Sequence, residues 1–269
     1  MSMTLEEKST EYIQKKIKEK PEFGIILLGN QFHQLVQEIK NPICIPYEKI
    51  PNFTKVYGKF ISGDIEGKKV LFLIEPFSSY YEEEYTPFPL VMCKNIGIDK
   101  LILINISGGV NPNYKTGDVM LVKDHINLFP ESPNMKKFMK NNFFGITEPY
   151  DQKMLEMAEN IAMNHNIIIQ KGVYVAYPYP HYKTPAEYAM IRSMGGDSVG
   201  MSNIVSSVIT ARCMDLRVFA ISIMMGMGLS EEQKGSSESI HLMKSFFQET
   251  EKSIPLLILI VKEFIKLCF

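Results

Sequence analysis

Two groups of residues in this 269-residue sequence have types and spacing that suit ligand binding. In the first group, Asn105, Ser107 and the pair Gly108-Gly109 follow the apolar run 101–104. An amide, a hydroxyl and two glycines at the end of a strand could present hydrogen-bonding groups to a small molecule at close range. A plain turn from strand to loop needs the same residue types, so the pattern alone supports either interpretation.

Ser202 belongs to the second group, the segment "GMSN" at 200–203, which directly precedes a predicted helix over 204–214. Its hydroxyl and the free amides of the first helical turn could hold an anion such as phosphate. The alternative is a plain helix cap, which is the commoner role of a serine at this position.

Other reactive chemistry has little support in the sequence. No histidine has the spacing of a metal site, and no GxSxG, P-loop or GxGxxG motif occurs, so we expect neither a metal nor a cofactor. His125, in "KDHINL", is expected to pack and hydrogen-bond structurally. Tyr177, Tyr179, Tyr182 and Tyr188 gather near one predicted strand end, where they could stack on a flat ligand or fill an interface.

Short apolar runs alternate with helix-period stretches along the chain, which predicts an α/β fold with a mostly parallel central sheet. The predicted strands are Gly24 to Leu28, Lys69 to Ile74, Lys100 to Ile104, Val119 to Lys123, Gly172 to Tyr177 and Leu216 to Ile221. The predicted helices are Asn30 to Lys40, Pro89 to Ile96, Tyr150 to His165, Pro185 to Ser193, Ile204 to Met214 and Ser239 to Leu267. Ligands of such folds bind at the carboxyl ends of the strands.

Composition restricts the partners and the compartment. Lys plus Arg (29) nearly equals Asp plus Glu (30), so no net field favours nucleic acid or a membrane surface. The four cysteines form no CxxC pair, which favours reduced thiols and a cytoplasmic protein. The charged N-terminal segment has no apolar signal core, and the apolar tract 254–269 is too short to span a bilayer.

No repeat or linker divides the chain. We therefore expect one domain over residues 1–269, with residues 1–22 as an N-terminal helical extension.

Two long segments resemble the trimeric, low-molecular-mass purine nucleoside phosphorylases. "LILINISGGVNPNYKTGDVMLVKDHINLF" is similar to the family's run of a strand, N-A-A-G-G, N-P, G-D and D-H-I-N. "GVYVAYPYPHYKTPAEYAMIRSMGGDSVGMSNIVSSVITARCMDLRVFAISI" resembles its second signature. The resemblance implies an α/β sandwich around a mixed sheet flanked by helices. It also implies a homotrimer, a purine nucleoside as substrate, and phosphate as co-substrate without a cofactor.

In that family, phosphate attacks C1′ of a purine nucleoside and releases the base through a transition state in which the ribose carries positive charge. Phosphate then needs cationic or donor groups, and the purine needs a carboxylate and an amide. At the phosphate, Asn30 stands for a serine of the family, Phe53 for a histidine, and Pro76 and Ser78 for the Arg and His of G-R-x-H-x-Y. Tyr80 retains the tyrosine of that motif.

The purine end departs from the family as well. Lys183 replaces the glutamate of F-E-T, and Gly226 replaces the asparagine of T-N. Elsewhere in the pocket, Ile106 replaces an alanine whose backbone amide contacts phosphate in the family. Met201 and Ser202 keep the residue types of the family's G-M-S. The resemblance therefore assigns the substrate site to Asn30, Ser78, Tyr80, Ile106, Tyr182, Lys183, Met201, Ser202 and Gly226.

Each lost electrostatic partner typically costs about 3 to 4 kcal/mol of transition-state stabilisation. The resemblance therefore predicts a catalytically degenerate homologue, weak or inactive as a pentosyltransferase, that acts as a structural or partner-binding scaffold by binding a partner protein or a larger assembly. The alternative is an active phosphorylase or hydrolase of altered specificity, with an anion site rebuilt from Lys183, Ser202, Asn30 and Ser78. A nucleoside sensor without turnover is a third option. Phe143 or Phe144 is the candidate for the aromatic residue that a neighbouring subunit lends to the family's active site.

Overall fold

The computed structural model describes most of the chain. The described residues are 4–53, 58–75, 87–130, 138–139, 145–179, 183–228 and 239–268. The strands are β1 (Phe23–Leu28), β2 (Lys40–Pro46), β3 (Lys59–Ile65), β4 (Lys68–Glu75), β5 (Lys100–Gly109), β6 (Val119–Asn127), β7 (Gln170–Ala176), β8 (Ser198–Gly200) and β9 (Arg217–Met227). The helices are α1 (Leu5–Ile17), η1 (Asn30–Phe32), α2 (His33–Gln37), η2 (Tyr47–Lys49), α3 (Phe88–Ile96), α5 (Gln152–Asn164), α6 (Pro185–Ser193), α7 (Ile204–Cys213) and α8 (Ser239–Leu267).

All the described strands belong to one mixed sheet, as the predicted fold class requires. The order is β2-β3-β4-β1-β5-β8-β7-β6-β9, and a further pairing joins β9 to β5. Strands β4, β1, β5 and β9 are mutually parallel neighbours, while β2 and β3 are antiparallel additions at one edge. The pairing of β5 with β9 closes half of the sheet into a ring through β8, β7 and β6.

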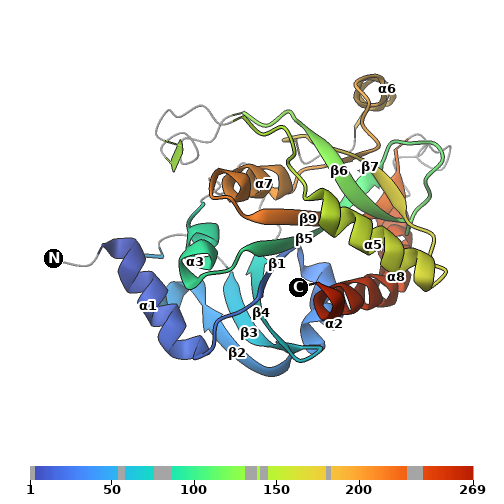
Figure 1. The fold of residues 1–269 in the computed structure, drawn as a ribbon. Coiled ribbons are helices and arrows are strands. Elements are labelled where there is room, and N and C mark those ends of the chain that lie inside the picture. Colours follow the sequence, from blue (N-terminus) through green and yellow to red (C-terminus); the bar gives the residue numbers. More distant parts are fainter. Residues whose placement is uncertain are drawn as a thin grey trace.

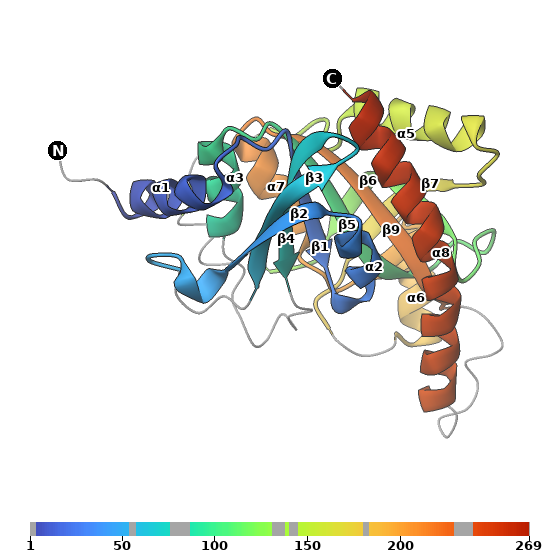
Figure 2. The same ribbon diagram turned by 90° about the horizontal axis from the view of Figure 1, so that it is seen from below.

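Helices cover both sides of this sheet (Figure 1). On one side α1, α3 and α7 contact one another in succession, and on the other side α8 contacts α2, α5 and β9. The long helix α8 runs along one flank of the molecule (Figure 2). Its Phe264 stacks on Phe219 of β9, with ring centroids 5.0 Å apart, and meets Phe23 of β1 edge-on. The apolar C-terminal tract thus belongs to a helix that packs on the sheet.

The predicted elements are recovered with two main differences. The antiparallel strands β2 and β3 were missed, and the predicted helix over 30–40 is only η1 followed by the short α2, because β2 begins at Lys40. Pro185–Ser193 has the predicted bounds, and a capping box starts it, in which Thr184 and Glu187 exchange side chain to backbone hydrogen bonds. Local capping chemistry thus fixed a boundary that apolar periodicity could not.

Candidate functional site

On one side of β5, strand pairing is interrupted at residues 105–107, which the sequence suggests for ligand binding. The ladder between β1 and β5 ends at the pair Leu27 and Ile104, and the ladder between β5 and β8 begins at Gly108. Between these ladders, residues 105–107 pair with β9 but with neither β1 nor β8. Such a gap at the carboxyl ends of parallel strands is where open α/β sheets bind their ligands.

Three buried side chains meet beside this gap, and we call them the polar cluster: Asn105 of β5, Tyr174 of β7 and Ser202. The amide Nδ2 of Asn105 donates to Oγ of Ser202 over 2.8 Å, and Oη of Tyr174 lies 3.1 Å from the same oxygen. Asn105 and Tyr174 are fully buried, and Ser202 is 6% exposed. The structure thus joins the two segments from which the sequence argument began.

Ser202 does not cap a helix. The N-cap of α7 is Asn203, whose side chain makes no capping hydrogen bond. The hydroxyl of Ser202 is bonded within the polar cluster instead. The helix-cap alternative is therefore wrong, and the start of α7 keeps backbone N–H groups of the kind that attract anions.

The two glycines after Asn105 do not form a turn. Strand β5 continues to Gly109, and neither Gly108 nor Gly109 has a positive φ. A Cβ at Gly109 would lie 2.3 Å from Sδ of Met227 on β9. The expected end of the strand at Ile104 is therefore wrong, and a side chain at Gly109 would require the flexible end of Met227 to move.

At the purine end, α8 fills the space that a side chain at Gly226 would need. A Cβ at Gly226 would lie 3.0 Å from both Cδ2 and Cε2 of Phe246, whose ring is 6% exposed. The position where the family has an amide is thus backed by a buried aromatic ring. Phe246 was not anticipated from the sequence, because α8 follows β9 only after the intervening segment 229–238.

Lys183 is held against its own loop. Its Nζ donates to the carbonyl oxygen of Tyr179 over 2.9 Å and lies 4.8 Å from the ring centroid of Tyr177. Burial lowers the pKa of the Lys183 ammonium, and the nearby Glu187 carboxylate opposes that shift. The cation that replaces the family's glutamate therefore already interacts with a carbonyl and a ring.

Glu187 has its carboxylate oxygens in use. Oε1 accepts the hydroxyl of Tyr177 over 2.7 Å, and Oε2 accepts the backbone N–H of Thr184 over 2.6 Å. The first bond, together with burial, raises the pKa of Tyr177 to about 12. Tyr177 and Tyr179 also meet edge to face, with centroids 5.4 Å apart. These side chains organise the entry to α6.

Phe53, at the position assigned to a histidine, belongs to an aromatic cluster. Its ring centroid lies 4.6 Å from that of Tyr47, 4.7 Å from that of Phe88 and 6.1 Å from that of Phe60. A ring that packs among three others serves the core and offers no charge to phosphate.

The other predicted site positions are only partly described. Ile106 is 8% exposed and packs in the core, and Met201 is half-buried just before Ser202. Asn30 begins η1, but its side chain is outside the described part of the structure. Also outside it are Ser78, Tyr80, Tyr182, Phe143 and Phe144.

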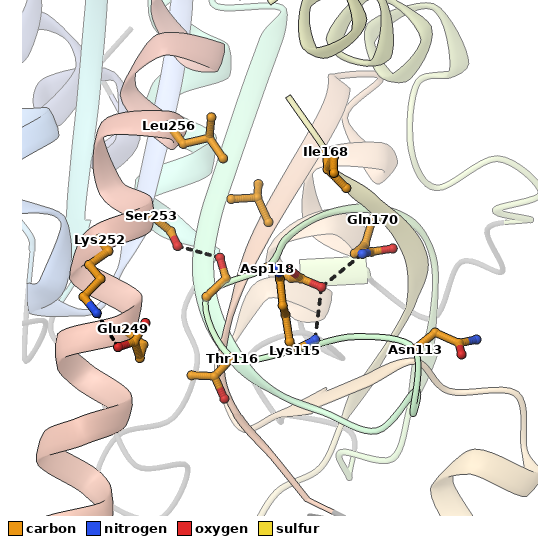
Figure 3. A pocket seen from close by; sticks show the side chains of 12 residues that line it. Asn113, Lys115, Thr116, Asp118, Ile168, Gln170, Glu249, Lys252, Ser253 and Leu256 are labelled. Atoms are coloured by element: carbon orange, nitrogen blue, oxygen red, sulfur yellow. Dashed lines mark hydrogen bonds and ion pairs between the residues drawn. The ribbon is translucent and has the colours of Figure 1, made fainter. Parts of the chain in front are cut away.

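A separate cavity of about 490 Å³ lies between α8 and the loop that connects β5 to β6 (Figure 3). Asp118 accepts hydrogen bonds there from Gln170 and from the backbone N–H of Lys115, and Lys252 pairs with Glu249. Because Gln170 begins β7, this cavity lies at the opposite end of that strand from the polar cluster. The hydroxyl of Ser253 on α8 donates to the carbonyl oxygen of Gly117, and this bond fastens the loop to α8.

Within the described ranges, no group of three or more His, Cys, Asp or Glu side chains could hold a metal ion. No helix in that part of the chain is long and apolar enough to cross a membrane. His125 behaves as expected, since its Nδ1 lies 3.1 Å from Oη of Tyr150 and burial lowers its pKa.

Comparison with known proteins agrees with this arrangement. Residues 25–266 match the model of the Phosphorylase superfamily. Purine nucleoside phosphorylase 1 of Bacillus subtilis is 38% identical over 227 residues, which cover 80% of this chain and 83% of that protein. This chain belongs to the purine nucleoside phosphorylase family. The Geobacillus stearothermophilus enzyme of the same name is 35% identical over 237 residues, covering 84% of this chain and 86% of the relative.

The fold agrees equally well with solved members of the family. The crystal structure of Schistosoma mansoni purine nucleoside phosphorylase in complex with adenosine superposes with a TM-score of 0.84 at 29% identity. That comparison covers 98% of this chain and 97% of the other. The recognised family and the predicted fold class are both confirmed. The family's reaction uses phosphate as co-substrate and no cofactor.

The predicted scaffold role gains no support from these relatives, whose names denote enzymes. The degeneracy of individual positions stays a prediction.

Proposed function

We propose that this chain binds a purine nucleoside and phosphate in the family's pocket and carries out phosphorolysis far more slowly than a typical enzyme. The polar cluster carries this proposal, because it keeps a serine hydroxyl beside an uncapped helix N-terminus at the opening of the sheet. Such a position supplies donors to an anion without a cationic side chain.

The rate is low because the charged partners are missing. The sequence between Tyr57 and Leu90 contains no arginine or histidine, and Lys183 is engaged by Tyr179 and Tyr177. One lost donor or charge typically costs about 10²- to 10³-fold in kcat, and such losses are not additive. We therefore expect at least about 10³-fold slower turnover than the usual 1 to 10³ per second.

A matched pair of proteins tests the proposal. The full chain and its Ser202→Ala variant are purified in parallel and incubated with inosine or guanosine and phosphate, and base release is followed over long times. Slow release by the full chain, lost in the variant, supports the proposal. Release that the variant retains would come from a contaminating phosphorylase and would contradict it.

A scaffold without turnover is the second candidate, and the absence of arginine and histidine between Tyr57 and Leu90 favours it. It predicts no base release and no nucleoside binding. A thermal-shift titration separates it from a sensor, because a ligand at 100 times its dissociation constant should add about 2.7 kcal/mol to the unfolding free energy. Turnover within about tenfold of the ordinary range would exclude both the scaffold and the sensor.

We further propose a single domain, a homotrimer and a cytoplasmic location. The family membership and the single sheet support the first of these. Light scattering of the purified chain tests the trimer.

A further inference from the structure

Within the described part of the chain, the buried hydroxyl of Tyr174 makes one hydrogen bond, to Ser202. The side chain is fully buried, and Ser202 Oγ lies 3.1 Å from its oxygen. Burial raises the pKa of Tyr174 to about 12, although Ser202 and Asn105, which could donate to the ionised phenolate, oppose that shift. The phenol therefore keeps its proton at neutral pH, and that proton needs an acceptor.

The acceptor is Oγ of Ser202. The other nearby oxygen, Oδ1 of Asn105, is buried and has no hydrogen-bond partner within the described structure, so it does not receive the phenol proton. Nδ2 of Asn105 donates to Oγ of Ser202 as well, over 2.8 Å. A serine hydroxyl has two lone pairs and one proton. Both lone pairs are thus occupied, and the serine proton must be donated to a third group.

Gly200 makes this arrangement possible. A Cβ at Gly200 would lie 2.3 Å from Oη of Tyr174 and 3.0 Å from Cζ. Glycine at this position therefore leaves the space through which the phenol reaches Ser202. The G-M-S motif then has a physical reason for its first residue as well as for its last.

We propose that Tyr174 is a positioning residue that fixes the Ser202 hydroxyl as an obligate donor to an anionic oxygen of the phosphate class. This inference rests on the proposed function, since it concerns the same site. Among the described residues, Ser202 has no partner besides Asn105 and Tyr174. The hydroxyl also lies beside the uncapped start of α7, where the helix dipole favours negative charge.

The experiment measures the affinity of inorganic phosphate by isothermal titration for the full chain and the variants Tyr174→Phe, Ser202→Ala and the double variant. Each single change should weaken phosphate binding about tenfold, the worth of one hydrogen bond to a charged group. The double variant should bind no more weakly than Ser202→Ala alone, because Tyr174 acts through Ser202. Tyr150→Phe is the matched control, since its phenol is equally buried but bonds to His125. It should leave the affinity unchanged.

The outcomes separate this inference from the proposed function. If the full chain binds neither phosphate nor inosine, both fall. If it binds phosphate and Tyr174→Phe binds equally well, the inference alone is overturned. Losses that add in the double variant would overturn it too, since Tyr174 would then act independently of Ser202. Should Tyr174→Phe fail to fold in urea titrations, Gly200→Ala disturbs the same contact, and an unchanged phosphate affinity in that variant overturns the inference.

Discussion

Placing the family's amide at position 226 should destabilise this chain. A Cβ there would lie 3.0 Å from two ring atoms of Phe246, whereas carbon atoms pack best at about 3.5 to 4.0 Å. The ring is buried and α8 is packed on β9, so a few tenths of an ångström must come from a side chain with little room to move. Overpacking of a buried site typically costs about 1 to 3 kcal/mol, and Gly226→Asn should lower the unfolding free energy by that amount.

Urea denaturation of four proteins measures this effect: the parent chain, Gly226→Asn, Phe246→Leu and the double variant. Leucine at 246 removes the contacting ring, so the double variant should lose less stability than the sum of the two single changes, by about 1 kcal/mol or more. Gly145→Asn is a matched control, because a Cβ at Gly145 meets no described residue within 4 Å. It should change stability by less than about 0.5 kcal/mol.

The reasoning would be refuted if Gly226→Asn were as stable as the parent chain, or if Phe246→Leu gave no rescue. The result also bears on substrate recognition. A Lys183→Glu and Gly226→Asn variant made to strengthen purine binding must include Phe246→Leu, because the added amide otherwise collides with the ring. Tighter purine binding by that triple variant than by the parent chain, measured by thermal shift, would support the assignment of these positions to the base.

Three further changes test the described contacts. Gly200→Ala should lower the unfolding free energy by about 1 to 3 kcal/mol, and Tyr174→Phe should relieve part of that loss by removing the nearest atom. Asp151→Asn should cost about 1 kcal/mol at pH 7, because Asp151 pairs with Arg217 over 2.7 Å. Arg217 lowers the pKa of Asp151, so this stabilisation is present above the unfolded value of about 3.9 and is lost as pH falls below it. The unfolding free energies of the parent chain and Asp151→Asn, measured in urea, should therefore converge at acid pH. A difference that stays constant with pH would contradict the ion pair. Thr184→Ala should cost about 1 kcal/mol through the lost cap, and an unchanged midpoint would contradict it.

The elements with strong local signals followed from the sequence. The bounds of α6 depend on a threonine cap, a first-turn proline and a glutamate three residues after the cap, which act within one helical turn. The buried parallel strands were recognisable as continuous apolar runs, because both of their faces are covered. The edge strand β2 escaped detection, since its exposed residues and Pro42 and Pro46 are typical of loops.

The site was predictable only in part. Asn105 and Ser202 could be named from their places after a strand and before a helix, and the family resemblance pointed to Lys183 and Gly226. The hydrogen bond between Asn105 and Ser202 could not, because 97 residues separate them and only the ring closure of the sheet brings them together. Whether Ser202 capped a helix or met other side chains depended on the same closure.

The sequence by itself determined the family, the layers of helix and strand, and the loss of charged types at several site positions. Those properties depend on residue identity and short-range periodicity, which the chain carries wherever it folds. Only the tertiary structure decided that Tyr174 shares Ser202 with Asn105 and that Phe246 stands behind Gly226. Contacts between strands and helices distant in the chain depend on register and packing, and a shift of one residue in β5 or β7 would turn Asn105 or Tyr174 to the opposite face of the sheet.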